Sequence, residues 1–333
     1  MKTLNVGSSL IVKSGNQEIT EACYKLFEFL NFKAKVQEVD KIFIKPNIVS
    51  MQHYTFGSIT DPIIIENLVN YIRDFSNKEI IIVESETIWK TRKRMIKDEP
   101  DYNPKEQLSG FRLSLTNSGI KDIIGKNKKI KVLNITRAKK LDSRIVKKKI
   151  REKYNKKSDK IFPEFFRMIP LEFDAKAIFI SLSKLKSHCF KDTKVTNCMK
   201  NQYGLIAYPD KTVYHYKLTE TIQQVNMIAQ SFFDCFYITE ALRYTMEGGG
   251  PTRGETLRNL GIAIAGTNPV EIDAIAATLM EVNPKRLDYL QSSRRLLGDY
   301  KEDDMRKIPK SLKYRFKLHP DIDRITREDR IYQ

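Results

Sequence analysis

The stretch AIFISLSKLKSHCFKDTKVTNCMKNQYG, residues 177–204, decides the fold of this chain. It opens on Ala177–Ile180, a continuous apolar run rich in β-branched and aromatic residues without a helical period, which is typical of a buried strand. A polar loop follows, and we interpret Val195–Gln202 behind it as a helix. Open α/β sheets bind ligands where such a loop leaves the carboxyl end of a strand. The stretch therefore predicts an α/β fold with a candidate site at this strand end.

The polar loop places three basic side chains at alternating positions, Lys184, Lys186 and His188. On an extended segment this spacing puts all three on one side. Lysines supply point charges for an anion, and histidine can carry a proton near neutral pH. The alternative interpretation is two solvated lysines and a structural histidine.

The segment after the loop adds polar groups that also suit an anion. If Val195–Gln202 is helical, Thr196 and Lys200 share one face, which Thr193 could join, and Asn201 follows Lys200. Hydroxyl, amide and helix N–H groups donate hydrogen bonds to anions. We therefore expect Thr196, Lys200 and Asn201 to bind the ligand.

An earlier strand, Lys41–Ile44, runs into Lys45, Pro46 and Asn47. Proline cannot continue a central ladder, so the strand stops there. Asn47 offers both a donor and an acceptor to a ligand. Lys45 and Asn47 are thus candidate ligand-binding residues, and an ordinary turn is the alternative.

Thr60-Asp61-Pro62 is a helix start, since aspartate caps helices and proline suits the first helical position. The strand Ile80–Val83 follows, which predicts a βαβ unit in a parallel sheet. Glu84 and Glu86 leave its carboxyl end and are reserve candidates for a base or a metal ligand.

A glycine-rich segment, Met246–Gly254, lies downstream. Glycines such as Gly249 and Gly250 let backbone N–H groups approach an anion, and Glu247 could hold a proton or a cation. The spacing fits neither a P-loop nor a dinucleotide fingerprint, and a flexible turn is the alternative. A further strand precedes the helix that Pro269 opens, with Asp273 near its start as another candidate.

These pieces together carry a resemblance. Lys184-Leu185-Lys186-Ser187-His188, then Thr196, then Lys200-Asn201-Gln202-Tyr203-Gly204 resembles the K-x-K-T-H … T … K-N-x-x-G signature of the domain-of-unknown-function 362 family. The segments beginning at Lys45, Thr60, Met246 and Asn268 agree with it in order. Ser187 departs from the family's threonine, and Glu240 is the nearest candidate for an aspartate expected before the glycine-rich segment.

The resemblance implies a site and leaves the reaction open. Many members of this family are joined to a ferredoxin module with four-iron–four-sulfur clusters. The four cysteines of this chain, Cys23, Cys189, Cys198 and Cys235, lack the close C-x₂-C spacing of such clusters. A metal at His188, Cys189 and Cys198 is disfavoured because adjacent residues rarely ligate one ion, so we expect no metal site.

Positive charge is concentrated between Lys90 and Lys160, where 24 lysines and arginines face 8 acidic residues. This accounts for sixteen of the chain's net charge of +18. Lys147, Lys148 and Lys149 are candidates for contact with nucleic acid, and a solvated elaboration is the alternative. We expect the apolar runs Ile130–Ile135 and Ser143–Ile150 to be strands of a small subdomain.

The 333 residues, 41% of them hydrophobic, are enough for a globular protein with a real core. We expect a mostly parallel sheet with helices on both faces. Residues 1–88 and 161–300 would form this α/β core, 89–160 a basic insertion and 301–333 a surface tail. No apolar leader or membrane span stands out, and the unevenly spaced cysteines fit a reducing compartment, so we expect a cytoplasmic protein.

Three functions compete. The first is an enzyme or binding protein for an anionic small molecule, with catalysis by His188, Lys186 and Glu247. The second is a nucleic-acid-associated protein that uses the basic insertion. The third is a redox or cofactor-handling protein, by analogy with the ferredoxin-linked members. Neither a cofactor nor an oligomeric state follows from the sequence.

Overall fold

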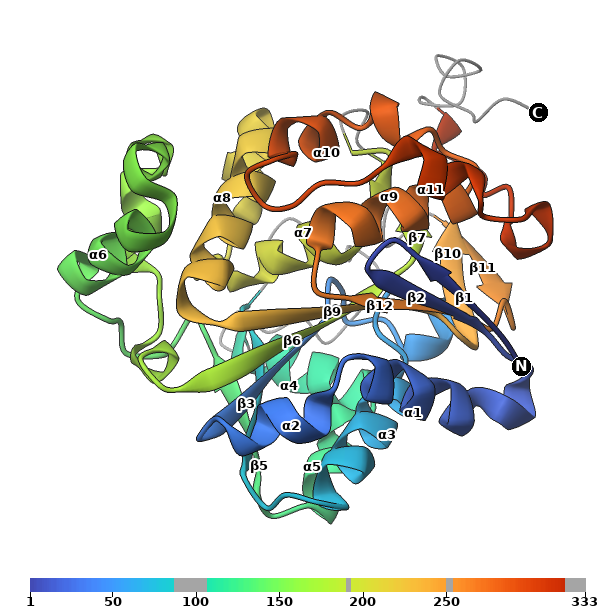
Figure 1. Cartoon of the computed structure of the whole chain (residues 1–333). Helices are drawn as coiled ribbons and strands as arrows, with labels where there is room; N and C mark the ends of the chain where they lie inside the picture. The colour runs from blue at the N-terminus through green and yellow to red at the C-terminus, as the bar shows by residue number, and fades with distance from the viewer. Residues whose placement is uncertain (87–106, 190–192, 250–253, 321–333) are drawn as a thin grey trace, which may run out of the picture.

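A computed structural model describes residues 1–86, 107–189, 193–249 and 254–320. Its centre is an eight-stranded sheet in the order β1-β2-β12-β9-β6-β3-β4-β5, with helices on both faces (Figure 1). The α/β fold predicted from the sequence is confirmed. The strands of this sheet are β1 (Lys2–Val6), β2 (Ser9–Lys13), β3 (Lys41–Pro46), β4 (Glu79–Glu84), β5 (Ile130–Asn134), β6 (Ala177–Lys184), β9 (Asp234–Ala241) and β12 (Ile262–Gly266).

The central strands are buried on both faces because their apolar residues face two separate cores. Ile42 and Ile44 of β3 pack into the core on one side, whereas Phe43 packs into the core on the other. The first core is covered by α1 (Ile19–Phe29), α2 (Phe32–Gln37), α3 (Pro62–Arg73), α4 (Gln107–Asn117) and α5 (Ile120–Lys126). The second is covered by α6 (Ser143–Tyr154), α7 (Cys198–Asn201), α8 (Leu218–Phe232), α9 (Pro269–Leu279), α10 (Asp288–Ser293) and α11 (Glu302–Arg306).

Strand direction decides which strand ends meet. The four pairs from β9 through β6, β3 and β4 to β5 are parallel, so these strands end at one edge of the sheet. The predicted βαβ unit of β3, α3 and β4 is among them, and Asp61 caps α3 by accepting the N–H of Ile63 at 3.1 Å. β12 runs antiparallel to β9, so its carboxyl end points away from that edge.

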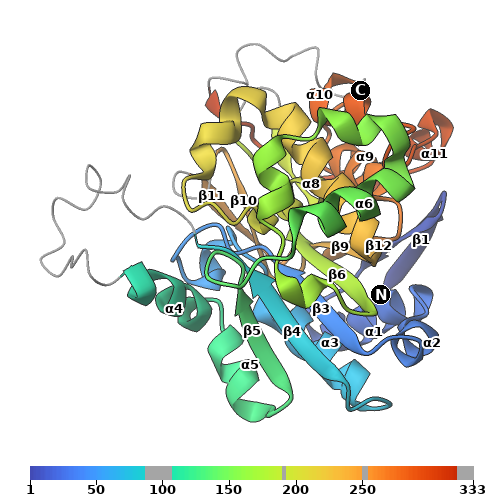
Figure 2. The same cartoon turned by 90° about the vertical axis from the view of Figure 1, so that its left-hand side faces the viewer.

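The basic segment differs from its prediction. β5 pairs with β4 along its whole length and is the edge strand of the main sheet, not part of a small subdomain (Figure 2). Ser143–Ile150, expected to be a strand, lies in α6. Asp142 caps this helix, and Val146, Ile150 and Tyr154 recur every four residues to bury one face. The lysines between them fill its outer face, which is a helical rather than a strand pattern.

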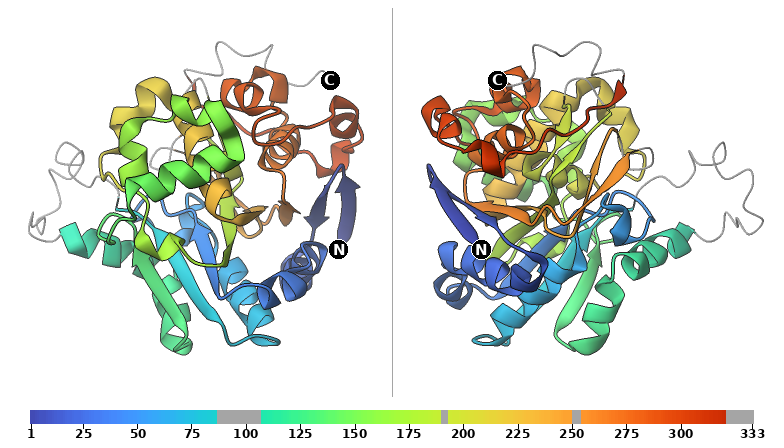
Figure 3. Two further views of the ribbon diagram at one scale, coloured as in Figure 1. Left: turned by 60° about the vertical axis from the view of Figure 1, so that its left-hand side comes forward. Right: turned by 90° about the vertical axis from the view of Figure 1, so that its right-hand side faces the viewer.

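The C-terminal segment also departs from the expected surface tail. Residues 301–320 bury apolar side chains, including Met305, Phe316 and Leu318, in the second core. Figure 3 shows this red segment lying across the helices of that layer. The remaining residues of the predicted tail, 321–333, lie outside the described residues. Throughout the described ranges, the helices are too short or too polar for any to cross a lipid bilayer.

Candidate functional site

The loop after β3 is fixed by α3 and β6. The hydroxyl of Thr60 accepts the backbone N–H of Asn47 at 2.7 Å and donates to the carbonyl of Leu182 at 2.8 Å. The N–H of Thr60 in turn donates to the carbonyl of Asn47 at 3.0 Å. Pro46 ends the β3 ladder as predicted, and this network then holds Asn47 at the carboxyl edge of the sheet.

Lys45 and Glu84, at the ends of neighbouring strands, form a buried ion pair. Burial lowers the pKa of Lys45 and raises that of Glu84, while the contact between them opposes both shifts. Gly204 makes room for the pair, since a Cβ there would lie 2.5 Å from Lys45 Nζ and 2.4 Å from Glu84 Oε1.

A cavity of about 80 Å³ opens beside this pair. It brings together residues from the ends of β3 and β4 and from the segment around α7. Its lining consists of Lys45, Asn47, Ile48, Val49, Glu84, Thr196, Lys200, Asn201, Tyr203, Gly204 and Lys211. Three ammonium groups therefore face one carboxylate in this wall.

Two polar side chains in the wall are buried without a partner. Both side-chain atoms of Asn47 and the hydroxyl of Thr196 make no hydrogen bond within the described parts of the chain. Asn47 is 1% exposed and Thr196 is 4% exposed. Leaving such groups unpaired costs about 1–3 kcal/mol each, so both side chains are available to a water molecule or a bound ligand.

Among the described residues neither Lys200 nor Lys211 forms an ion pair with a carboxylate, whereas Lys45 is paired with Glu84. The ammonium nitrogen of Lys200 lies over the ring of Tyr203, 4.9 Å from the ring centroid. Burial lowers the pKa of Lys200 to about 8. Lys211 donates to the carbonyl of Glu86 at 2.5 Å, and burial lowers its pKa to about 8 as well. Both lysines can therefore be charged or neutral close to physiological pH.

The predicted catalytic pair lies behind this wall. Lys186 belongs to β7 (Lys186–Ser187), which pairs with β8 (Val195–Thr196), and its amine donates to the carbonyl of Ser58. Burial and the ammonium groups of Lys200 and Lys184 hold the pKa of Lys186 well below its ordinary value. Neither Lys186 nor His188 lines the cavity.

His188 is 7% exposed, and its Nδ1 lies 3.2 Å from the hydroxyl of Thr193. Burial and the charges of Lys200 and Lys186 hold the pKa of His188 well below its usual range. The imidazole is therefore neutral at physiological pH. Thr196 stands on β8 rather than on a helix, because α7 begins only at Cys198. The expectation of a helix over Val195–Gln202 was wrong in this part.

A comparison with family models places this chain in a family. Residues 42–278 match the family described as a domain of unknown function, DUF362. The chain belongs to this family. No curated protein and no solved structure matches it.

In this DUF362 chain the signature residues divide into two groups. Lys45, Asn47, Thr196, Lys200 and Gly204 line the cavity. Lys184, Lys186 and His188 support it from the strand end and the β7–β8 hairpin. The quoted segments therefore contain residues that line the cavity and residues that lie on the strands next to it.

Lys184 has a structural partner. It pairs with Glu240 across β6 and β9, and both side chains are fully buried. Asn201, predicted to bind ligand, lines the cavity but donates to the carbonyl of Lys45 at 3.0 Å and to the hydroxyl of Ser181 at 2.9 Å. Its amide therefore ties β3 to β6.

Asp273 lies away from the cavity. Its carboxylate accepts the N–H groups of Cys198 and Met199, at 2.8 and 3.3 Å, and the hydroxyl of Tyr289 at 3.0 Å. Burial raises the pKa of Asp273 to about 6. The antiparallel direction of β12 explains why this helix start does not join the other strand ends. Asp273 instead anchors the start of α7.

Glu247 and Gly249 lie apart from the cavity lining as well. Glu247 ends β10 (Tyr244–Glu247), which pairs with β11 (Glu255–Arg258), and it accepts the N–H of Lys317 at 2.8 Å. The N–H of Gly249 donates to Ser187 at 3.3 Å. Gly250 lies outside the described residues.

Sequence reasoning missed Tyr203 and Lys211 as site residues. Tyr203 lay within the quoted signature but at one of its unspecified positions. Lys211 begins a short 3₁₀ segment, Lys211–Lys217, and carried no local signal. It reaches the cavity because the chain folds back across the end of β4, where the backbone carbonyl of Glu86 accepts a hydrogen bond from the Lys211 amine.

The cysteines and the α6 lysines are the remaining candidate residues from the sequence. Cys23, Cys198 and Cys235 are buried, and Cys189 is half-buried. Across the described ranges, no group of three or more His, Cys, Asp or Glu is placed to hold a metal ion. On α6, Lys149 pairs with Asp174 at 2.9 Å, whereas Lys147 and Lys148 are exposed.

Proposed function

We propose that this protein binds the anionic group of a small molecule, a carboxylate or a phosphate, in the cavity beside Lys200. The observation that carries the proposal is the meeting of Lys200 with two buried, unpartnered polar side chains, Asn47 and Thr196, in one wall. A bound anion would accept hydrogen bonds from all three groups. These hydrogen bonds would offset the cost of burying the Asn47 and Thr196 side chains without a partner.

The charge balance of the wall supports an anion over a cation. Glu84 is already paired with Lys45, which leaves Lys200 and Lys211 to face the cavity. A volume of about 80 Å³ suits a carboxylate or phosphate group rather than a whole cofactor. The rest of a larger ligand would extend from the opening.

If the protein is an enzyme, Lys200 is the better candidate for proton transfer than Glu247. A pKa of about 8 lets Lys200 exchange a proton near neutral pH, and it lines the cavity. Glu247 is held by Lys317 outside the cavity lining. Lys186 and His188 stand behind the wall, and the charge of Lys200 helps to lower the pKa of both.

Isothermal titration of the full chain with sulfate, phosphate and malonate tests this proposal. We expect saturable binding of at least one of these anions, and a loss of about tenfold in affinity in Lys200→Ala, since hydrogen bonds to charged groups contribute about 1.5–3 kcal/mol. Lys217→Ala is the matched control, because Lys217 also lies over aromatic rings but does not line the cavity. Equal affinities of the two variants would refute the proposal.

A second function, contact with a polyanion such as RNA or DNA, is favoured by the surface of α6 and the 3₁₀ segment Asn155–Lys160. Residues 143–160 contain nine lysines and arginines against two acidic residues, and eight of the nine are exposed. The helix α6 packs on α8 and lies at the left edge of the molecule in Figure 1. Such a cluster attracts phosphate backbones through counterion release.

A further inference from the structure

A second cavity of the described structure is separate from the Lys200 cavity. It has a volume of about 570 Å³ and lies among the end of α9, the 3₁₀ turn Pro284–Arg286 and α11. No residue lines both cavities. A volume of this size is typical of sites that enclose a ligand the size of a nucleotide.

The wall of this cavity combines cations with an apolar floor. Four of its ten lining residues are lysine or arginine and one is acidic. The cations are Lys285, Arg286, Arg306 and Lys313. Pro284, Met305 and Tyr300 are buried and provide the apolar part. Together these surfaces suit a ligand that carries both an anionic and a ring-shaped apolar part.

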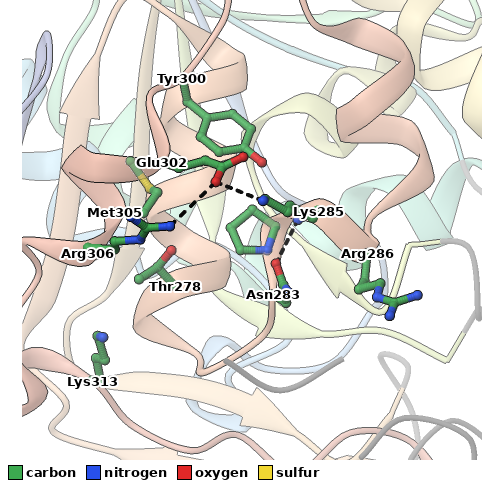
Figure 4. A pocket seen from close by; sticks show the side chains of 10 residues that line it. Thr278, Asn283, Lys285, Arg286, Tyr300, Glu302, Met305, Arg306 and Lys313 are labelled. Atoms are coloured by element: carbon green, nitrogen blue, oxygen red, sulfur yellow. Dashed lines mark hydrogen bonds and ion pairs between the residues drawn. The ribbon is translucent and has the colours of Figure 1, made fainter. Parts of the chain in front are cut away.

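The carboxylate of Glu302, the acidic lining residue, lies between two of these cations. Its Oε2 lies 2.8 Å from Lys285 Nζ and 3.9 Å from an Arg306 nitrogen, so one carboxylate bridges two cations (Figure 4). The Glu302 side chain is 39% exposed. A ligand phosphate in its place would meet both cations, with Lys313 on the same wall.

We propose that this cavity binds a phosphate-bearing ring compound of the nucleotide class. The phosphates would replace the Glu302 carboxylate between Lys285 and Arg306, and the ring would lie on the apolar floor formed by Pro284, Tyr300 and Met305. The site is independent of the proposed anion site at Lys200.

Calorimetric titration of the full chain with ATP, in the presence of EDTA, tests the proposal. Inorganic tripolyphosphate and adenosine serve as the charge-only and ring-only probes. We expect ATP to bind at least about tenfold more tightly than either, because each probe lacks one of the two contact surfaces. Equal affinity for ATP and tripolyphosphate would overturn the proposal, since it would show charge attraction alone.

Variants locate the binding. Lys285→Gln and Arg306→Gln should each weaken ATP binding about tenfold, whereas Glu302→Gln should strengthen it severalfold by removing the competing carboxylate. Lys310→Gln is the matched control, because Lys310 is exposed, close in sequence and absent from the wall. Glu302→Gln keeps the test decisive if the other variants unfold. Unchanged ATP affinity in Glu302→Gln, or an equal loss in Lys310→Gln, would refute the assignment.

Discussion

Lys184 Nζ lies 2.6 Å from Glu240 Oε1, and the two side chains are fully buried at paired positions of β6 and β9. The second oxygen of Glu240 accepts the N–H of Leu242 at 3.0 Å, and Oε1 also accepts the N–H of Asp61 at 3.0 Å. One carboxylate thus joins β6, β9 and the start of α3. Lys184, which the sequence suggested as a ligand contact, is therefore part of the framework.

Lys184→Met should destabilise the protein by about 3–5 kcal/mol, because it leaves the buried Glu240 carboxylate without its counter-charge. The double variant with Glu240→Gln should recover much of this loss, since the amide oxygen still accepts a backbone N–H and carries no charge. Urea unfolding measures the free energy of unfolding of the single and the double variant. A single variant within about 1 kcal/mol of the wild type would show that the pair is not needed.

Thr196→Val should stabilise the ligand-free protein by about 1 kcal/mol while weakening anion binding. The hydroxyl of Thr196 is buried without a partner, so the free protein gains when it is removed. Thr60→Val is the matched control, because its hydroxyl makes two hydrogen bonds and its loss should destabilise. For Thr196→Val, the melting temperature should rise while the affinity for sulfate falls. A fall in both the melting temperature and the sulfate affinity would mean that Thr196 is structural.

Sulfate affinity should be constant below pH 8 and fall above it. The pKa of Lys200 is lowered to about 8, so its ammonium is present below this pH and is lost above it. Lys211 titrates in the same range and adds to the fall. Lys200→Arg keeps its charge and should flatten the profile, which calorimetry between pH 6 and pH 10 can measure. Identical profiles for wild type and Lys200→Arg would exclude Lys200 as the titrating contact.

Gly204→Ala should disrupt the Lys45–Glu84 pair. The added Cβ would lie within 2.6 Å of atoms of both side chains, and overpacking of this kind costs about 1–3 kcal/mol. Sulfate affinity should fall with it, because Lys45 lines the cavity. Gly125→Ala in α5 is the control, since a Cβ there meets nothing within 4 Å. Equal stabilities of the two variants would show that the site tolerates the side chain.

Replacing Lys148, Arg151 and Lys157 with Glu should abolish binding of single-stranded RNA at low salt, if the α6 surface contacts polyanions. Lys149 is left intact because it pairs with Asp174, and its reversal would disturb packing. The triple variant Lys2, Lys25 and Lys33→Glu changes the net charge equally at exposed positions away from α6. Equal loss in both triple variants, or binding that ignores salt, would argue against this surface.

The local sequence determined much of the sheet and its helices. Runs such as Ile80–Val83 and Ala177–Ile180 predicted strands because an apolar run flanked by polar residues is buried on both faces of a parallel sheet. The cap at Asp61 predicted the start of α3 within one residue. The cavity lysines Lys45 and Lys200 were also predicted. Lys45 directly follows a predicted strand, and Lys200 lies in the segment that follows the loop after another strand, so the local sequence was enough to single them out.

Only the tertiary structure decided which of the candidates meet. The partner of Lys184 is 56 residues away in sequence, and that of Lys45 is 39 residues away, so no local pattern could separate paired from unpaired lysines. Asp273 was misplaced because strand direction, set by long-range pairing of β12 with β9, turns its helix away from the shared edge. Lys211 was missed because its partner at the end of β4, the carbonyl of Glu86, is 125 residues away in sequence. Local propensity fixes the elements, whereas pairing across the sheet fixes their neighbours and therefore the charge that each side chain meets.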